Sequence, residues 1–235
     1  ADEIKVTGEV EICLNGCMIT AANANRVFHV QEGGTLTLYS CRMGYFRCLF
    51  EPVDLVTNKY EWQLPQTGSA TVASPGLVTG GLLNSASGSE SSGLTGDWAR
   101  SGGGIYVAGG GTLILQDGEI SGNQAVAYGG GVFVDSGGAF TMLGGRITGN
   151  VAGGNGAGVY IHSNARFEFC GGLISDNTAI GGYKSNTVET TTSGNGGGIY
   201  NNQGQVTISG GTISDNTARK DAEDETFVPG NGGGS

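Results

Sequence analysis

One sequence unit recurs four times between Gly102 and Ala218, and this repeat constrains the fold more than any single residue does. Each copy begins with glycines and a short apolar segment, and continues with a second apolar segment. It ends with Ile, then Ser or Thr, one further residue and Asn. A fixed period of a few tens of residues is typical of a solenoid, in which each turn of the chain stacks on the turn before it. The copies begin at Gly102, Gly129, Gly156 and Gly196.

Each copy contains three strand-like segments, which in the first copy are residues 105–107, 112–115 and 119–121. Side chains alternate between the two faces of a strand, so one apolar set in each segment faces the interior. Helices are excluded because glycine pairs interrupt every window with a helical apolar period. We therefore predict an all-β right-handed parallel β-helix with three short strands per coil, since crossovers between parallel strands are almost always right-handed. The interior residues of the first copy are Ile105, Val107, Leu113, Leu115 and Ile120.

The chain divides into three regions by the strength of this repeat. Residues 1–40 carry it in weaker form, because Val27–Leu38 aligns with Gly104–Leu115. Residues 41–101 form an irregular insertion whose second half is rich in Ser, Gly and Thr. Residues 102–235 hold the regular repeats, with insertions at 183–195 and 219–231. The insertions before Gly102, Gly196 and Gly232 are expected to leave from one corner of the solenoid.

Composition excludes several classes of partner. The 235 residues include 47 glycines without a collagen triplet, which suits the corners of a solenoid. Charged residues make up 14% and the net charge is −10, which argues against binding to nucleic acid or to anionic membranes. No apolar run is long enough to span a bilayer, so we expect no membrane insertion by this segment.

An asparagine recurs at one equivalent position near the end of each repeat. Stacked Asn side chains can hydrogen-bond through their amides to the copies above and below, as in ladders of stacked sheets. Asn also tolerates the unusual backbone of a corner. We therefore predict a structural ladder, not a ligand site, formed by Asn123, Asn150, Asn177 and Asn216.

Two sequence patterns resemble known surface proteins. The glycine-led strand followed by I-[ST]-x-N resembles the repeats of polymorphic outer membrane proteins, in which GGA[IL] and FxxN recur; Ile stands here in place of that Phe. Glu11–Ile19 (EICLNGCMI) resembles the opening of β-helix regions in surface proteins of Gram-positive gut bacteria, with Cys17 in place of a His. The similarity covers Glu11–Leu38 and Gly102–Ala218. It implies a secreted or surface-attached adhesin or spacer.

An aromatic residue follows the first inward residue of each regular copy. These side chains face outward and should stack about 4.8 Å apart on one sheet, with His29 in the same column of the N-terminal copy. Aromatic faces suit sugar rings and protein partners, so the column is a candidate ligand-binding surface. The alternative is that the insertions fold over the column and bury it. The column consists of Tyr106, Phe133, Tyr160 and Tyr200.

Two carboxylates share another column, Asp176 and Asp215, directly before two of the ladder asparagines. Stacked carboxylates repel unless a cation intervenes, and calcium prefers oxygen ligands, so calcium is the one candidate cofactor. The alternative is a solvated acidic edge.

His162 lies above Asp135 in a further column, either as a catalytic pair or as two exposed side chains.

Five cysteines leave one without a partner if the others pair. The spacing of the N-terminal four is too loose for a zinc knuckle, so disulfides are the other interpretation, with Cys41 and Cys48 as the local pair. Their oxidation state stays open. Cys170 follows an inward Phe and is expected to be a packed free thiol. The N-terminal four are Cys13, Cys17, Cys41 and Cys48.

Functional patterns are sparse. Leu64–Gly68 (LPQTG) matches a sortase motif, but no hydrophobic segment or basic tail follows it, so we interpret it as a coincidence.

We predict a non-catalytic extracellular module, an adhesin or spacer that binds a surface glycan or protein or associates end to end into filaments. The alternative is a polysaccharide lyase or hydrolase, which would need three or more convergent carboxylates.

Overall fold

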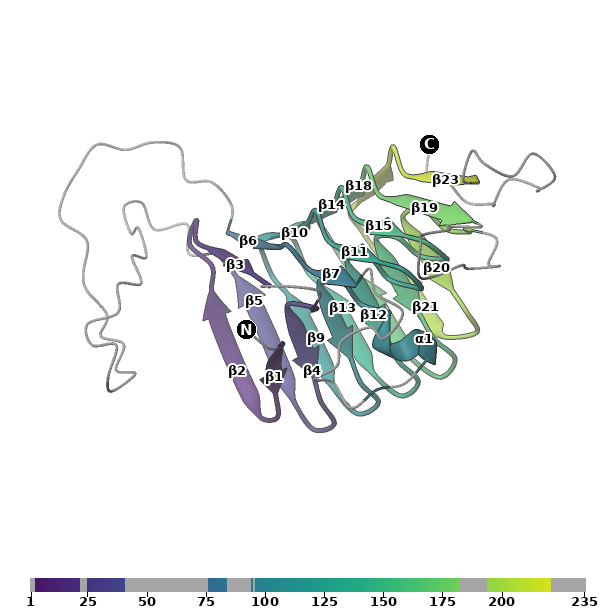
Figure 1. Ribbon diagram of the computed structural model, residues 1–235. Coiled ribbons are helices and arrows are strands. Elements are labelled where there is room, and N and C mark those ends of the chain that lie inside the picture. The colour runs from purple at the N-terminus through teal and green to yellow at the C-terminus, as the bar shows by residue number, and fades with distance from the viewer. Residues whose placement is uncertain are drawn as a thin grey trace, which may run out of the picture.

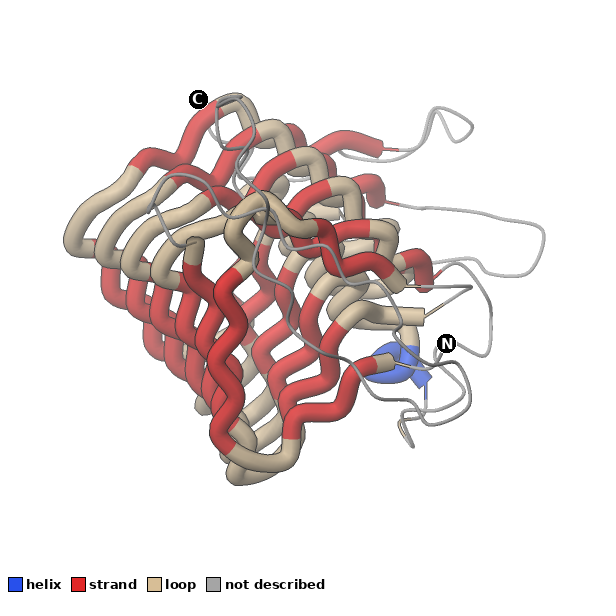
Figure 2. The backbone as a smooth tube through the Cα atoms, turned by 90° about the vertical axis from the view of Figure 1, so that its left-hand side faces the viewer, coloured by secondary structure: helices blue, strands red, loops and turns tan. Residues whose placement is uncertain are grey.

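The computed structural model describes residues 3–21, 25–40, 76–83, 94, 96–181 and 194–220. These residues form a parallel β-solenoid with four sheets (Figure 1). Each coil contributes one strand to each sheet in turn, except that the first described coil adds no described strand to the fourth sheet. Strands of successive coils pair in parallel. Figure 2 shows the coils superposed, with loops at the corners.

The first two sheets carry the longer columns of apolar residues. Sheet 1 contains β1 (Ile4–Val6), β4 (Phe28–Val30), β8 (Ile105–Val107), β12 (Val132–Val134), β16 (Val159–Ile161) and β20 (Ile199–Asn201). Sheet 2 contains β2 (Glu9–Cys13), β5 (Thr35–Tyr39), β9 (Thr112–Leu115), β13 (Ala139–Met142), β17 (Arg166–Phe169) and β21 (Gln205–Ile208).

The other two sheets lie on either side of the asparagine column. Sheet 3 contains β3 (Met18–Thr20), β6 (Leu77–Thr79), β10 (Glu119–Ser121), β14 (Arg146–Thr148), β18 (Leu173–Ser175) and β22 (Thr212–Ser214). Sheet 4 contains β7 (Leu82–Leu83), β11 (Gln124–Ala125), β15 (Val151–Ala152), β19 (Thr178–Gly181) and β23 (Thr217–Lys220).

The parallel solenoid is confirmed, but a coil has four strands and not the three predicted. The fourth strand follows the ladder asparagine directly and is only two residues long in β11 and β15. Two residues cannot show a period of two, so the pattern contained no strand signal there. The recurring Ala125, Ala152 and Ala179 are its buried inward residues.

The region 41–101 is interrupted by part of a coil. Residues 76–83 form β6 and β7, which pair with β10 and β11, so two separate segments replace the single predicted insertion. The segment 41–75 connects sheets 2 and 3, whereas 84–101 connects sheets 4 and 1. The segment 182–193 also connects sheets 4 and 1. The expected insertion at 219–231 lies outside the described residues beyond Lys220.

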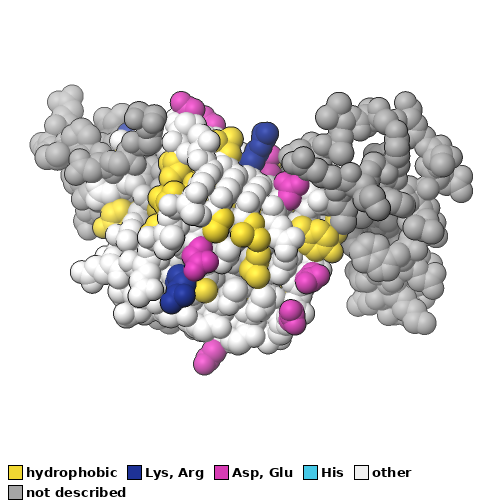
Figure 3. All heavy atoms as spheres, turned by 180° about the vertical axis from the view of Figure 1, so that it is seen from behind, with side chains coloured by type: hydrophobic (Ala, Val, Ile, Leu, Met, Phe, Trp, Pro, Cys, Tyr) yellow, Lys and Arg dark blue, Asp and Glu magenta, His cyan; other side chains and the backbone are white. Residues whose placement is uncertain are grey.

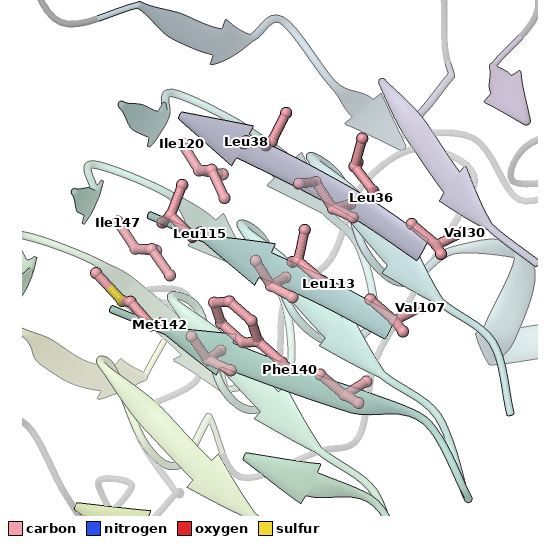
Figure 4. Close-up of a cluster of buried hydrophobic side chains, with 14 of the residues drawn as sticks. Val30, Leu36, Leu38, Val107, Leu113, Leu115, Ile120, Phe140, Met142 and Ile147 are labelled. Atoms are coloured by element: carbon pink, nitrogen blue, oxygen red, sulfur yellow. The ribbon is translucent and has the colours of Figure 1, made fainter. Parts of the chain in front are cut away.

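The core is a stack of apolar columns between the sheets. Figure 4 shows Leu36, Leu113 and Phe140 in one column of sheet 2 and Leu38, Leu115 and Met142 in the next. All are buried, as are the five interior residues predicted for the first regular repeat. Phe140 and Phe167 continue the first column as stacked rings, with centroids 4.8 Å apart.

The predicted asparagine ladder is confirmed by a repeated set of hydrogen bonds. Nδ2 of Asn123 donates to Oδ1 of Asn150 at 3.0 Å, and the backbone N–H of Asn123 donates to the same oxygen at 3.0 Å. Asn150 donates in the same way to Asn177, and Asn177 to Asn216. Each Nδ2 also donates to a carbonyl of the preceding coil, such as that of Ile120. Each buried amide of the ladder therefore finds its hydrogen-bond partners in the neighbouring coils.

The residue before each ladder asparagine has a left-handed backbone. Gly122 and Gly149 have φ of 65° and 64°, and Asp176 and Asp215 have φ of 57° and 56°. Gly adopts this conformation without strain and Asp tolerates it better than most residues. The restriction of this column to Gly in two coils and Asp in the next two therefore follows from the corner geometry.

A short helix, α1 (Gly96–Ala99), lies against the side of the stack (Figure 1). Within the described part of the chain, no helix is long and apolar enough to cross a membrane.

Candidate functional site

The aromatic column runs along the outer face of sheet 1. The strand register places His29 beside Tyr106, then Phe133, Tyr160 and Tyr200, as the repeat predicts. Ring centroids lie 5.1 Å apart from Tyr106 to Phe133, 5.0 Å from Phe133 to Tyr160 and 5.3 Å from Tyr160 to Tyr200. His29 meets Tyr106 edge-on at 5.2 Å. Four coils thus contribute a continuous stack of rings, and His29 of a fifth coil extends the column edge-on.

Most of this column is covered. Tyr106, Phe133 and Tyr160 are buried, and Trp98 of α1 and Tyr128 pack against them. The three rings present no open face to a ligand, so the column is not the bare binding surface that one interpretation expected. The burial of these three rings instead agrees with the other interpretation, in which an insertion folds over the column. Tyr200 is half-buried.

A buried ion-pair cluster, which the sequence pattern did not predict, closes the N-terminal end of the column. Oε2 of Glu3 lies 3.0 Å from Nε of Arg26, and Oε1 of Glu3 lies 3.0 Å from Nδ1 of His29. Both the Glu3 and the Arg26 side chains are fully buried. The contact between Arg26 and Glu3 is an ion pair and not a hydrogen bond, because the N–H at Nε of Arg26 is not aligned with the Glu3 oxygen. Glu3 and Arg26 lie outside the repeat pattern, so no periodic signal marks them.

Arg26 also holds α1 in place. Its Nη2 donates to the backbone carbonyls of Ala99 at 3.0 Å and Trp98 at 3.4 Å, near the C-terminal end of the helix. The guanidinium carbon lies 4.7 Å from the centre of the Tyr106 ring, in a cation–π contact. Burial lowers the pKa of Arg26 to about 10, and the negative charge of Glu3 opposes part of that shift.

The predicted pair of Asp135 and His162 lies at the rim of the column. Oη of Tyr106 donates to Oδ2 of Asp135 at 2.6 Å, and Nδ1 of His162 lies 4.0 Å from Oδ1 of Asp135. Nδ1 of His162 is also 3.1 Å from Oγ of Ser163. Trp98 packs edge-on against the imidazole at 5.1 Å. Asp135 and His162 are half-buried, so part of this polar pair faces solvent.

The two carboxylates proposed for calcium occupy corner positions. Oδ2 of Asp176 accepts hydrogen bonds from Oγ of Ser175 at 2.8 Å and Oγ1 of Thr148 at 3.5 Å. Asp176 and Asp215 are exposed. In the described ranges, no three His, Cys, Asp or Glu side chains gather closely enough to hold a metal ion. These two carboxylates therefore form no calcium cage with other such groups of the described chain.

The cysteines differ in state. Cys13 is disulfide-bonded, whereas Cys41 and Cys48, the expected local pair, lie outside the described residues. Cys170 is exposed, so the prediction of a packed thiol is wrong. It follows the inward Phe169, and alternation along the strand turns the next side chain outward.

Alkaline pH is expected to destabilise the fold through the covered tyrosines. Burial raises the pKa of Tyr106 and Tyr160 above the ordinary value of 10.0, and the hydrogen bond to Asp135 raises that of Tyr106 further. The stabilisation is complete below pH 10 and is lost as pH rises, because the unfolded chain ionises first. The lowered pKa of Arg26 acts in the opposite direction, but two raised phenols outweigh one lowered guanidinium.

The measurement is the melting temperature between about pH 8 and about pH 12. The Tyr160→Phe variant should show a shallower decline than the unaltered chain. Equal slopes would mean that burial of this phenol does not cause the loss.

No protein-family model, curated protein or solved structure matches this chain.

Proposed function

We propose that the chain is a non-catalytic extracellular structural module that associates end to end. The observation that carries this proposal is the exposure of core-facing residues in the last described coil. Ile208 is 58% exposed, although Leu115, Met142 and Phe169 in the same column are buried. Exposed apolar columns of this kind favour contact with a further coil.

The first described coil has a matching surface. Ile4 and Val10 are 45% and 37% exposed, although their counterparts Phe28 and Leu36 in the next coil are buried. Among the described strands, the first and last of each sheet have a neighbour on one side alone, and such edges are a template for further parallel pairing. Because the contact joins different surfaces of two copies, it produces a filament and not a closed dimer.

Extending the internal register indicates which residues would meet. Val206 would lie on Val10 of the next copy, Ile208 on Ile12, and Ile213 on Ile19. These pairs follow from the columns that the described coils already share.

Charge does not oppose this contact. The acidic Glu9 and Glu11 would face the uncharged Gln205 and Thr207 of the neighbouring copy. No pair of like charges is brought together at these positions, and like charges directly opposite would destabilise a sheet.

Other features support an extracellular location. The disulfide at Cys13 is typical of proteins in oxidising compartments. The face opposite that of Figure 1 carries scattered charged side chains among polar and apolar ones, without a broad basic area on its described part (Figure 3). An adhesive or spacing role suits such a surface better than binding to nucleic acid.

End-to-end association is expected to be visible in the solution mass and by electron microscopy, with filaments at about 100 µM protein and smaller species near 1 µM. Ile208→Glu should weaken association at least about tenfold, because a charge would enter the apolar contact. Val10→Glu at the other end should have the same effect. Leu143→Glu is the matched control, because Leu143 is 50% exposed on the side of the stack and not at an end.

A single monomer mass at every concentration, unchanged by Ile208→Glu, would contradict association between copies. It would instead indicate that the exposed residues of the last described coil are not a contact surface between copies. Release of reducing ends or unsaturated products from a polysaccharide panel would contradict the non-catalytic role and favour the lyase or hydrolase alternative.

A further inference from the structure

Half-buried aromatic and polar side chains gather where α1 meets sheet 1. We call this group the α1 surface. Unlike Tyr106 and Phe133 beneath it, each member is partly exposed. The α1 surface consists of Trp98, Tyr128, Asp135, His162, Tyr200 and Asn202.

Packing on the buried column holds its rings in place. Tyr128 stacks on Tyr160 at 4.8 Å, and Tyr200 stacks on the same ring at 5.3 Å. Trp98 lies 5.6 Å from Phe133 and 5.1 Å from His162. Rings that are already ordered lose little conformational entropy on binding a ligand, so the surface is preorganised.

Its polar groups offer both donors and acceptors. Asp135 contributes a carboxylate, His162 an imidazole, and Asn202 an amide that bonds to the hydroxyl of Tyr160. This mixture matches the hydroxyl groups of a sugar, each of which can donate and accept. Exposed aromatic faces match the apolar face of the same ring.

The charges of this region indicate a neutral ligand. Arg100 of the neighbouring segment is paired with Asp97, and the carboxylate of Asp135 faces the surface beside His162. No cation of the described residues here is left to neutralise an acidic sugar. A phosphate or uronate would therefore meet repulsion from Asp135.

We propose that the α1 surface binds a ring of a neutral oligosaccharide. Trp98 and Tyr200 contact the apolar face of the sugar, and Asp135, His162 and Asn202 bond its hydroxyl groups. This site goes beyond the structural role proposed above. Asp135 and His162 follow strands inside the stack, and α1 lies along its side (Figure 1). Tyr200 and Asn202 belong to the last described coil, so Ile208→Glu on sheet 2, which leaves the α1 surface unaltered, is needed to separate sugar binding from end-to-end association.

The test is isothermal titration of the full chain with cellohexaose, maltohexaose, chitohexaose and xylohexaose, together with oligogalacturonate as an acidic probe. At least one neutral probe is expected to bind. Trp98→Ala should weaken that binding about tenfold, and Tyr200→Ala about threefold or more. Leu143→Ala, which removes an exposed apolar side chain elsewhere, should leave the affinity unchanged.

Trp98→Ala could also displace α1, so Asn202→Ala serves as a second variant that leaves the helix contacts in place. Its binding should weaken while its melting temperature stays close to that of the unaltered chain. Failure of all four neutral probes, stronger binding of oligogalacturonate, or unchanged affinity in both Tyr200→Ala and Asn202→Ala would overturn the proposal. Loss of filaments in Ile208→Glu with sugar binding retained would show that the two functions are separate.

Discussion

Replacing Asn150 by alanine is expected to lower the free energy of unfolding by about 3–5 kcal/mol. The Asn150 side chain is in the middle of the ladder, where its Oδ1 accepts two hydrogen bonds from Asn123 and its Nδ2 donates to Asn177 and Ile120. Alanine would remove all four of these bonds. The groups left behind are buried and out of reach of water, so each keeps its desolvation penalty.

The matched control is Asn216→Ala at the end of the ladder. Asn216 accepts two hydrogen bonds from Asn177, and among the described residues its Nδ2 donates to the carbonyls of Ile174 and Ser214. Its replacement also removes four bonds, but we expect a smaller loss, because its neighbours Asp215 and Thr217 are exposed and water can reach the groups left behind. Urea unfolding followed by circular dichroism measures both. Equal losses for the two variants would mean that the ladder contributes no more in its middle than at its end.

Most of the fold could be predicted from the repeat, because every coil has the same physical requirements. The inward columns, such as Leu113 with Phe140, and the asparagine column both produce a strict spacing, so they could be predicted from sequence. The fourth strand could not, because a pair such as Gln124–Ala125 is too short to alternate. The strands at 76–83 were missed because Gly81 stands at the position of the ladder asparagine, so the I-[ST]-x-N signature is absent there.

The candidate site was predictable only where it follows the repeat. The aromatic column from Tyr106 to Tyr200 was found by alignment, and its burial under an insertion was one of two interpretations. The covering residue itself could not be named, since Trp98 lies in an insertion without a counterpart. Glu3 and Arg26 meet only through the folding of the first coils against α1. Contacts made once, between segments of unrelated pattern, leave no periodic trace in a sequence.

Replacing Glu3 by glutamine is the second change with a large expected effect, a loss of about 3–5 kcal/mol in the free energy of unfolding. The glutamine side chain would retain the shape and an oxygen that can accept from His29, but not the negative charge. Arg26 would then be a fully buried cation without its ion-pair partner. Nη1 of Arg26 makes no hydrogen bond to any described residue, so no bond at that nitrogen offsets the loss of the Glu3 charge.

The double variant Glu3→Gln with Arg26→Met separates the charge from the packing. If the cost of Glu3→Gln arises from a stranded cation, removing that cation should restore much of the lost stability, since apolar replacement of a buried pair is often neutral. The remaining loss would report the bonds from Arg26 to the carbonyls of Trp98 and Ala99. Glu11→Gln, which alters an exposed carboxylate of the same coil, should change stability by less than about 0.5 kcal/mol. A double variant less stable than Glu3→Gln alone would show that Arg26 acts chiefly as the anchor of α1 and that its pairing with Glu3 is secondary.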